Sequence, residues 1–242
     1  MTSNLLAGRS ALIIGGKSGI GAAVARQMTS AGARVAVADI PPNVLPQGFA
    51  KTFLECDVRC EASVSVAIGA TIEEFGKLDI LVNNAAVANG KPFLDMGWEE
   101  WNRTLQINLN GVAYGMKHAL PHMIERGYGR IINTASQLAH KPAPDNAAYC
   151  ASKAAVVALS ASVAQEVATT GVTVNCVCPG PTDTPMWRGS DEAWKTWKVS
   201  QLPIKRVGTP DEIASAYIYL ASEGASFMIG QSISPNGGDV MW

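Results

Sequence analysis

The chain contains 242 residues with a mass of 25.4 kDa, a size typical of one α/β domain. Hydrophobic residues make up 48% and charged residues 16%, which favours a compact core and excludes a disordered chain. With 19 basic and 20 acidic residues the net charge is -1, and no run of like charges offers a surface for nucleic acid or an anionic membrane. Apolar runs end before about 18 residues, and residues 1–8 lack the pattern of a signal peptide. We therefore expect a cytoplasmic protein without a membrane-spanning helix.

Short β-branched segments alternate with Ala-rich segments along the chain. In chain order we expect strands at 9–14, 34–38, 52–55, 78–82, 130–134, 172–177 and 232–234, and helices at 19–31, 61–75, 98–125, 147–168 and 210–221. The helix at 98–125 is expected to be irregular, three prolines exclude a regular helix over 41–46, and residues 182–207 show no clean period.

This alternation predicts the fold class, because parallel strands need crossover connections that place helices on both faces of the sheet. We expect one doubly wound Rossmann-type α/β domain over residues 1–242, with a mostly or wholly parallel sheet of about seven strands. No repeat, low-complexity segment or linker indicates a second domain.

The cysteines and histidines do not indicate a metal site or a disulfide framework. The five cysteines form no C-x-x-C pair. His118 and His122 are four apart on an expected helix, but no third ligand is spaced to join them. Cys176 and Cys178 alternate along an expected strand and should share one buried face. We expect no bound metal.

A glycine-rich turn, Gly15 to Gly21, lies between the first expected strand and the first expected helix. Glycines there let the backbone approach a pyrophosphate, which the helix N-terminus stabilises through free N–H groups. Glycines also serve ordinary strand-to-helix turns. The position of this G-x-x-x-G-x-G pattern favours nucleotide binding.

Asp39 ends the second expected strand, 18 residues after Gly21. A carboxylate there can accept hydrogen bonds from an adenosine ribose and repels a 2′-phosphate, which favours NAD over NADP. A strand-end aspartate that only starts a turn is the alternative.

Four further motifs follow in a characteristic order: Asn83-Asn84-Ala85-Ala86, Ser136, Tyr149-Cys150-Ala151-Ser152-Lys153, and Pro179-Gly180. In this order and spacing the chain resembles the short-chain dehydrogenase/reductase family over nearly its whole length.

The resemblance implies a role for each catalytic residue. Tyr149 is expected to act as general acid and base, and Ser136 to hold and polarise the substrate oxygen. Lys153 is expected to contact the nicotinamide ribose, and Asn108 to anchor a water that relays protons to it. The implied cofactor-binding residues are Gly15, Ser18, Gly19, Ile20, Gly21, Asp39, Asp57, Val58, Asn84, Tyr149, Lys153, Pro179, Gly180, Thr182 and Thr184.

Simple physical chemistry supports the Tyr149 and Lys153 pair. Four residues span about one helical turn, so both side chains face the same side. A nearby ammonium and a cationic nicotinamide both favour phenolate and lower the tyrosine pKa towards the working pH.

The chain departs from the family at two positions, with Ile14 where Thr is usual and Ala86 where Gly is usual. In relatives the Thr hydroxyl braces the turn that contains Asn84. The resemblance therefore predicts a less rigid turn here.

The expected substrate region follows Ser136 and Pro179-Gly180. Residues 182–207 form a lid in relatives, and here they contain Trp187, Trp194 and Trp197. Rings such as Trp187 either cover apolar substrate or pack the lid onto its own body. Gln137 and His140 are expected beside Ser136 and Tyr149 in the pocket, although His140 is equally compatible with a solvated loop.

The sequence thus predicts an oxidoreductase that transfers a hydride between NAD(H) and a secondary alcohol or ketone, with a small to medium apolar or aromatic substrate. The alternatives are a β-ketoacyl thioester reductase, which would normally use NADPH, and a non-catalytic dinucleotide-binding scaffold. Relatives often form dimers of dimers, so we expect a homo-oligomer. An alanine-rich face at 151–164 and the apolar end at 240–242 are the expected contacts.

Overall fold

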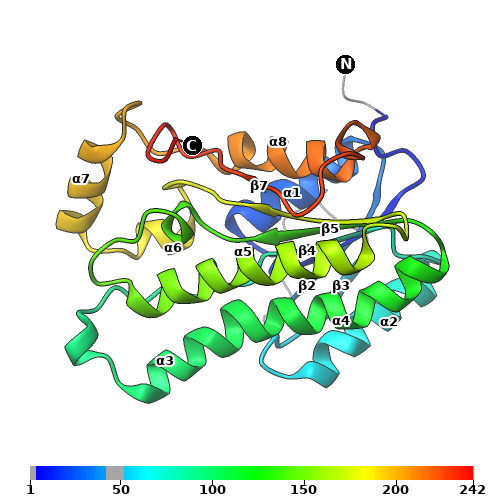
Figure 1. Cartoon of the computed structure of the whole chain (residues 1–242), viewed down its shortest axis with the longest axis horizontal. Coiled ribbons are helices and arrows are strands. Elements are labelled where there is room, and N and C mark those ends of the chain that lie inside the picture. The colour runs from blue at the N-terminus through cyan, green and yellow to red at the C-terminus, as the bar shows by residue number, and fades with distance from the viewer. Residues whose placement is uncertain (1–3, 42–51, 242) are drawn as a thin grey trace.

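The computed structural model describes residues 4–41 and 52–241. Their strands form one parallel seven-stranded sheet in the order β3-β2-β1-β4-β5-β6-β7 (Figure 1). The strands are β1 Ser10–Ile14, β2 Arg34–Asp39, β3 Thr52–Glu55, β4 Ile80–Asn83, β5 Gly129–Thr134, β6 Val172–Val177 and β7 Ser232–Ile233. The predicted fold class is confirmed.

Helices cover both faces of the sheet (Figure 1). They are α1 Gly19–Ser30, α2 Glu61–Phe75, α3 Trp98–Leu105, α4 Gly111–Glu125, α5 Ala147–Val167, α6 Pro185–Arg188, α7 Glu192–Gln201 and α8 Pro210–Ala221. One apolar cluster joins α2, α4 and α5 to the sheet, and a second joins α1 and α8 to the opposite face. Strands buried on both faces explain the continuous apolar runs in the sequence.

The structure adds detail in the helix expected to be irregular at 98–125 and in the region 182–207, which showed no clean period. The expected irregularity within 98–125 is a π-helical turn, Gln106–Asn110, between α3 and α4. The region 182–207 contains α6 and α7, which the sequence did not predict. Each begins at a side-chain cap, since Thr184 accepts from the Trp187 N–H and Asp191 accepts from the Trp194 N–H. The expectation for the prolines at 42–46 lies outside the described residues.

Helix α5 is long and apolar enough, by length and composition alone, to cross a membrane. No such segment was expected from the sequence, because the unbroken apolar runs are short although the mean hydropathy of this helix is high. In the fold, Val156 and Ala164 of this helix are buried in the core beside β6. One face of the helix thus belongs to the interior of the α/β fold, with 39% of its most apolar window buried.

The histidines and cysteines have separate structural partners. The Nε2 of His118 lies 3.1 Å from Glu61 Oε1, whereas the Nε2 of His122 accepts a hydrogen bond from the Leu78 N–H. Cys176 and Cys178 are buried in the same apolar cluster, as predicted.

The strand order reverses between β1 and β4, the usual place for a ligand in a doubly wound sheet. The segments that follow these strands open at the same edge of the sheet as the ends of β2 and β5.

Candidate active site

A cavity of about 830 Å³ lies at the carboxyl ends of the parallel strands. Its wall runs from the β1–α1 turn, past the ends of β2, β4 and β5, to the N-terminal turns of α5 and the α6–α7 segment. Most of the residues that the sequence proposed for cofactor and catalysis line this one space.

The β1–α1 turn forms a cradle that leaves no room for a side chain at Gly15 or Gly21. A Cβ on Gly15, whose φ is 80°, would lie 2.4 Å from the Ala85 backbone nitrogen, and one on Gly21 would lie 2.2 Å from Gly15 O. Gly21 does not line the cavity but permits the close packing of α1. The Ser18 side chain makes no cap hydrogen bond, and no acidic residue lies in the first turn of α1. The helix N-terminus therefore suits an anionic pyrophosphate.

Asp39 lies at the end of β2 and lines the cavity. Its carboxylate accepts hydrogen bonds from the Lys17 N–H at 3.1 Å and from the Ile40 N–H at 2.8 Å. The Lys17 ammonium lies 3.8 Å from the same carboxylate and donates to the Ile40 carbonyl at 2.7 Å. Lys17 is thus held beside Asp39.

Asp57 and Val58 line the cavity beyond β3, as expected, together with Arg59, which the sequence analysis did not single out. The Arg59 guanidinium forms hydrogen bonds to both Asp57 carboxylate oxygens and holds the pKa of that carboxyl below its usual range. This cation is therefore neutralised locally by Asp57.

Asn84 connects the turn after β4 to the glycine-rich cradle. Its Nδ2 donates to Gly15 O at 2.7 Å, and its Oδ1 accepts from Thr134 Oγ1 at 3.2 Å. The presence of Ile14 predicted a less rigid turn, but the structure shows a brace from β5 instead. The Asn84 side chain is held at both ends.

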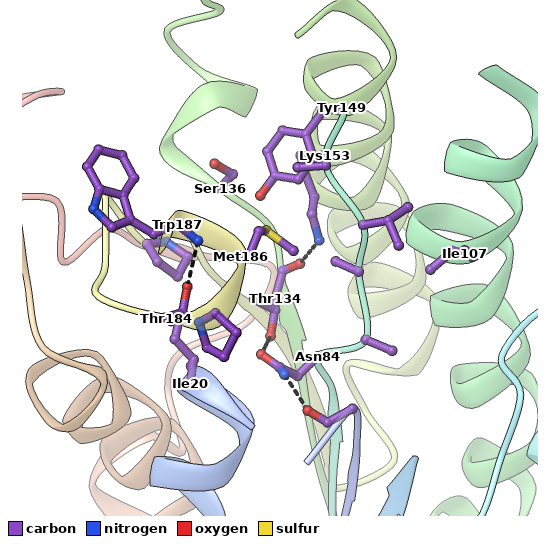
Figure 2. Close-up of a pocket in the computed structure, with 18 of the residues that line it drawn as sticks. Ile20, Asn84, Ile107, Thr134, Ser136, Tyr149, Lys153, Thr184, Met186 and Trp187 are labelled. Carbon is purple, nitrogen blue, oxygen red and sulfur yellow. Dashed lines mark hydrogen bonds between the residues drawn. The ribbon is translucent and has the colours of Figure 1, made fainter. Parts of the chain in front are cut away.

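Ser136, Tyr149 and Lys153 face the cavity from two elements (Figure 2). Ser136 follows β5, while Tyr149 and Lys153 lie one turn apart on α5. The Lys153 Nζ is 5.8 Å from the centre of the Tyr149 ring and donates to the Thr134 carbonyl at 2.6 Å. Lys153 is only 1% exposed. In the same turn of α5, the Ser152 hydroxyl accepts a hydrogen bond from Asn108 Nδ2 at 3.1 Å.

Burial sets the pKa values of both α5 residues. It raises the pKa of Tyr149 to about 12, against a hydrogen bond with Ser136 that lowers it. Burial also lowers the pKa of Lys153 to about 8. The tyrosine pKa is therefore raised in the protein alone, and the lowering expected from the sequence requires the positive charge of a bound nicotinamide as well.

Asn108 lies in the π-helical turn and does not line the cavity. Its Oδ1 accepts from the Val87 N–H at 2.8 Å, and its Nδ2 donates to the Val87 carbonyl at 2.9 Å. The side chain thus tethers the segment after β4 to α5. Its role in a water relay stays a prediction.

The segment after β6 closes the far side of the cavity. Pro179, Gly180, Thr182 and Thr184 all line it. A Cβ on Gly180 would lie 2.6 Å from the Asn236 Cα, so the close approach of the C-terminal segment requires glycine here. The Thr182 hydroxyl donates a hydrogen bond to the Gly180 carbonyl at 2.9 Å.

The expected substrate residues separate into two groups. Gln137, Trp187 and Trp194 line the cavity, and the two tryptophan rings pack on each other with centroids 5.6 Å apart. Trp187 thus packs on another ring of the lid and also lines the cavity, and its contact with substrate stays a prediction. His140, in contrast, does not line the cavity, and its Nε2 lies 3.6 Å from Cys178 Sγ just after β6. Trp197 is also outside the lining.

A buried ion pair that the sequence analysis missed holds α7 in place. The Lys198 ammonium, which is 2% exposed and lines the cavity, bonds Asp239 in the C-terminal segment. Lys141 Nζ bonds the other Asp239 oxygen at 2.9 Å. Burial alone would raise the pKa of Asp239, but the hydrogen bonds from Lys198 and Lys141 outweigh it and leave this pKa below its usual value.

Comparisons with known proteins agree with this geometry. The family model described as Enoyl-(Acyl carrier protein) reductase matches residues 14–239. The cis-4-hydroxycyclohexanecarboxylate dehydrogenase of Sinomonas cyclohexanicum is 37% identical over 238 residues, covering 95% of this chain and 96% of the relative. The 3-oxoacyl-(acyl-carrier-protein) reductase FabG of Vibrio cholerae is 35% identical, covering 98% and 99%. A crystal structure of a short-chain type dehydrogenase/reductase from Mycobacterium marinum superposes with a TM-score of 0.92 at 34% identity, covering 98% and 97%.

Proposed function

Because the chain belongs to the short-chain dehydrogenase/reductase family, we propose that it interconverts a secondary alcohol and a ketone with NAD(H). One observation carries the proposal: Ser136, Tyr149 and Lys153 face the same cavity that begins at the glycine-rich cradle. A scaffold without catalysis would not need these three side chains together at the strand ends.

The residues of the cavity fit a nicotinamide dinucleotide. The cradle at Gly15 and the open N-terminus of α1 suit its pyrophosphate, and Asp39 suits the adenosine ribose. Thr184 lies against Gly19 of the cradle, and Thr182 lines the wall after β6. When bound, this group supplies the carbon that takes up or returns hydride.

The chain's own residues manage the proton. Tyr149 in its phenolate form accepts the hydroxyl proton of the alcohol, and in its phenol form returns a proton to the ketone oxygen. Ser136 donates a hydrogen bond to that oxygen, and the Lys153 ammonium favours the phenolate. The Thr134 carbonyl holds Lys153 in place at 2.6 Å.

Charge at the end of β2 supports NAD rather than NADP. A 2′-phosphate would meet the Asp39 carboxylate, whose nearest cation, Lys17, is already engaged with Asp39 and the Ile40 carbonyl. Arg59 is likewise paired with Asp57. No described cation beside Asp39 is left over for a further phosphate.

The lining of the substrate end supports an apolar ring-bearing alcohol. Leu138, Met186, Trp187 and Trp194 lie there, and their apolar surface excludes water from the reacting oxygen. The relative from Sinomonas cyclohexanicum acts on a hydroxylated cyclohexane ring by its name. We therefore propose an alicyclic or aryl-substituted secondary alcohol of small to medium size.

A β-ketoacyl thioester reductase is the second candidate, favoured by the relative from Vibrio cholerae. It would use NADPH, so cofactor choice separates the two functions.

The test is an absorbance assay at the reduced-nicotinamide band. NAD or NADP is offered with cyclohexanols, aryl alcohols, aliphatic secondary alcohols and a β-hydroxyacyl thioester. We expect turnover of the ring-bearing alcohols with NAD. Preferential turnover of the thioester with NADP would support the second candidate, and no turnover with any pair would contradict both.

A further inference from the structure

Tyr217 is a fully buried tyrosine on α8, outside the cavity wall. Its side chain is 0% exposed within the apolar cluster that α8 shares with α1. A buried hydroxyl without a hydrogen bond costs free energy, so its partner matters. The Tyr217 hydroxyl lies 2.7 Å from Thr134 Oγ1 at the end of β5.

The hydrogen-bond directions follow from the neighbouring groups. Asn84 Nδ2 donates to the Gly15 carbonyl, so Asn84 Oδ1 is the acceptor that faces Thr134. Thr134 has a single hydroxyl proton, and it goes to Asn84. The Tyr217 hydroxyl must therefore be the donor to Thr134 Oγ1.

Thr134 joins this chain of bonds to the catalytic lysine. Its main-chain carbonyl accepts from Lys153 Nζ at 2.6 Å, while its side chain holds Asn84 at 3.2 Å (Figure 2). Asn84 Nδ2 in turn donates a hydrogen bond to the Gly15 carbonyl. This carbonyl is packed so closely against Gly21 that a Cβ on Gly21 would not fit. The Thr134 rotamer that bonds Asn84 Oδ1 thus orients the Asn84 amide so that its Nδ2 bonds the cradle at Gly15.

We propose that Tyr217 is a positioning residue for dinucleotide binding. It locks the Thr134 hydroxyl towards Asn84 and so keeps the cradle at Gly15 in its binding conformation. Without the Tyr217 bond, only the 3.2 Å bond to Asn84 restrains the Thr134 hydroxyl, so other orientations of the hydroxyl compete and binding must select the one that braces the cradle. This inference rests on the proposed function, because it assumes that the cradle holds a dinucleotide.

The test is the affinity for NADH, measured by fluorescence titration. Tyr217→Phe removes only the buried hydroxyl, and Tyr219→Phe makes the same change on the same helix at a side chain that is 45% exposed. We expect Tyr217→Phe to weaken NADH binding about two- to tenfold, the range of one neutral hydrogen bond. The KM for NAD should rise by a similar factor with little change in the KM for the alcohol, and Tyr219→Phe should match the wild type.

A double variant separates positioning from a general loss of stability. If Tyr217 acts through Thr134, adding Tyr217→Phe to Thr134→Val should cause little further loss of affinity, because the shared bond is already gone. Additive losses, or unchanged affinity in Tyr217→Phe while its melting temperature falls, would overturn the inference. A wild-type protein that binds no dinucleotide would instead overturn the proposed function itself.

Discussion

At the scale of single residues, Tyr149 makes the sharpest prediction. In Tyr149→Phe the ring keeps its place on α5, but no group is left to exchange a proton with the substrate oxygen. We expect turnover to fall at least about a hundredfold while the Kd for NADH changes little. A turnover assay and an NADH titration on the same preparation would measure the rate and the Kd. Substantial remaining turnover would exclude Tyr149 as the base.

The same residue predicts a pH dependence. Burial raises the pKa of Tyr149 to about 12 in the protein alone, so the hydroxyl is protonated near neutral pH. Alcohol oxidation needs the phenolate, whereas ketone reduction needs the phenol. The rate of oxidation should therefore rise with pH and the rate of reduction should fall. The apparent pKa with bound NAD should lie well below 12 if the nicotinamide charge acts as proposed, and a pH-independent rate of oxidation would contradict this assignment.

Asp39 predicts cofactor preference. Each charge-assisted hydrogen bond from the ribose to its carboxylate contributes about 1.5–3 kcal/mol. Asp39→Ser should lower kcat/KM with NAD at least about tenfold and raise it with NADP, because the repulsion of a 2′-phosphate is removed. Parallel assays with the two cofactors measure the ratio. A wild-type enzyme that used NADP as well as NAD would contradict this reading.

At the scale of elements, α7 in the segment 182–207 is joined to the C-terminal segment by the buried Lys198–Asp239 pair. Asp239→Asn would leave the Lys198 ammonium buried without its counter-charge. Breaking a buried pair costs about 3–5 kcal/mol. We expect a lower melting temperature and a higher KM for the alcohol, because α7 covers the substrate end of the cavity.

Glu192→Gln is the matched control, because it breaks a pair with Lys195 on the same helix where the glutamate side chain is 87% exposed. Such a surface pair contributes at most about 1 kcal/mol. The lowered pKa of Asp239 adds a pH effect with a definite sign: its contribution is present above the ordinary aspartate pKa and is lost as pH falls through the lower folded value. Equal effects of the two variants on the KM would show that the Asp239 pair does not position α7.

At the scale of the whole molecule, α5 predicts assembly. Ala151, Ala154 and Ala158 are exposed on this helix, which lets another helix approach closely. Ala164 is buried in the chain's own core and is not part of that surface, a correction to the stripe proposed from the sequence. Of the apolar end at 240–242, position 242 lies outside the described residues. Light scattering at micromolar concentration should give the mass of a dimer or tetramer, and a monomer mass would contradict the proposal.

Most of the fold and part of the candidate site could be predicted from the order of the residues. Strand and helix positions depend on local periodicity, so the seven parallel strands and most helices could be predicted. The glycine-rich turn and Asp39 followed from their places at strand ends, which a parallel sheet brings to one edge. The roles expected of Ser136, Tyr149 and Lys153 followed from the resemblance to the short-chain dehydrogenase/reductase family. Helices α6 and α7 escaped prediction because short capped helices show little periodicity.

Only the tertiary structure decided how those residues are supported. Tyr217 and Thr134 are 83 positions apart, and Lys141 and Asp239 are 98 apart, so no local pattern marks either pair. Arg59 lines the cavity, although nothing in the sequence singled it out. His140 does not line the cavity, although the sequence placed it in the pocket. Periodicity shows which face of an element is buried. Which polar groups meet there depends on the packing of elements distant in the chain, because each buried donor must find an acceptor within the folded interior.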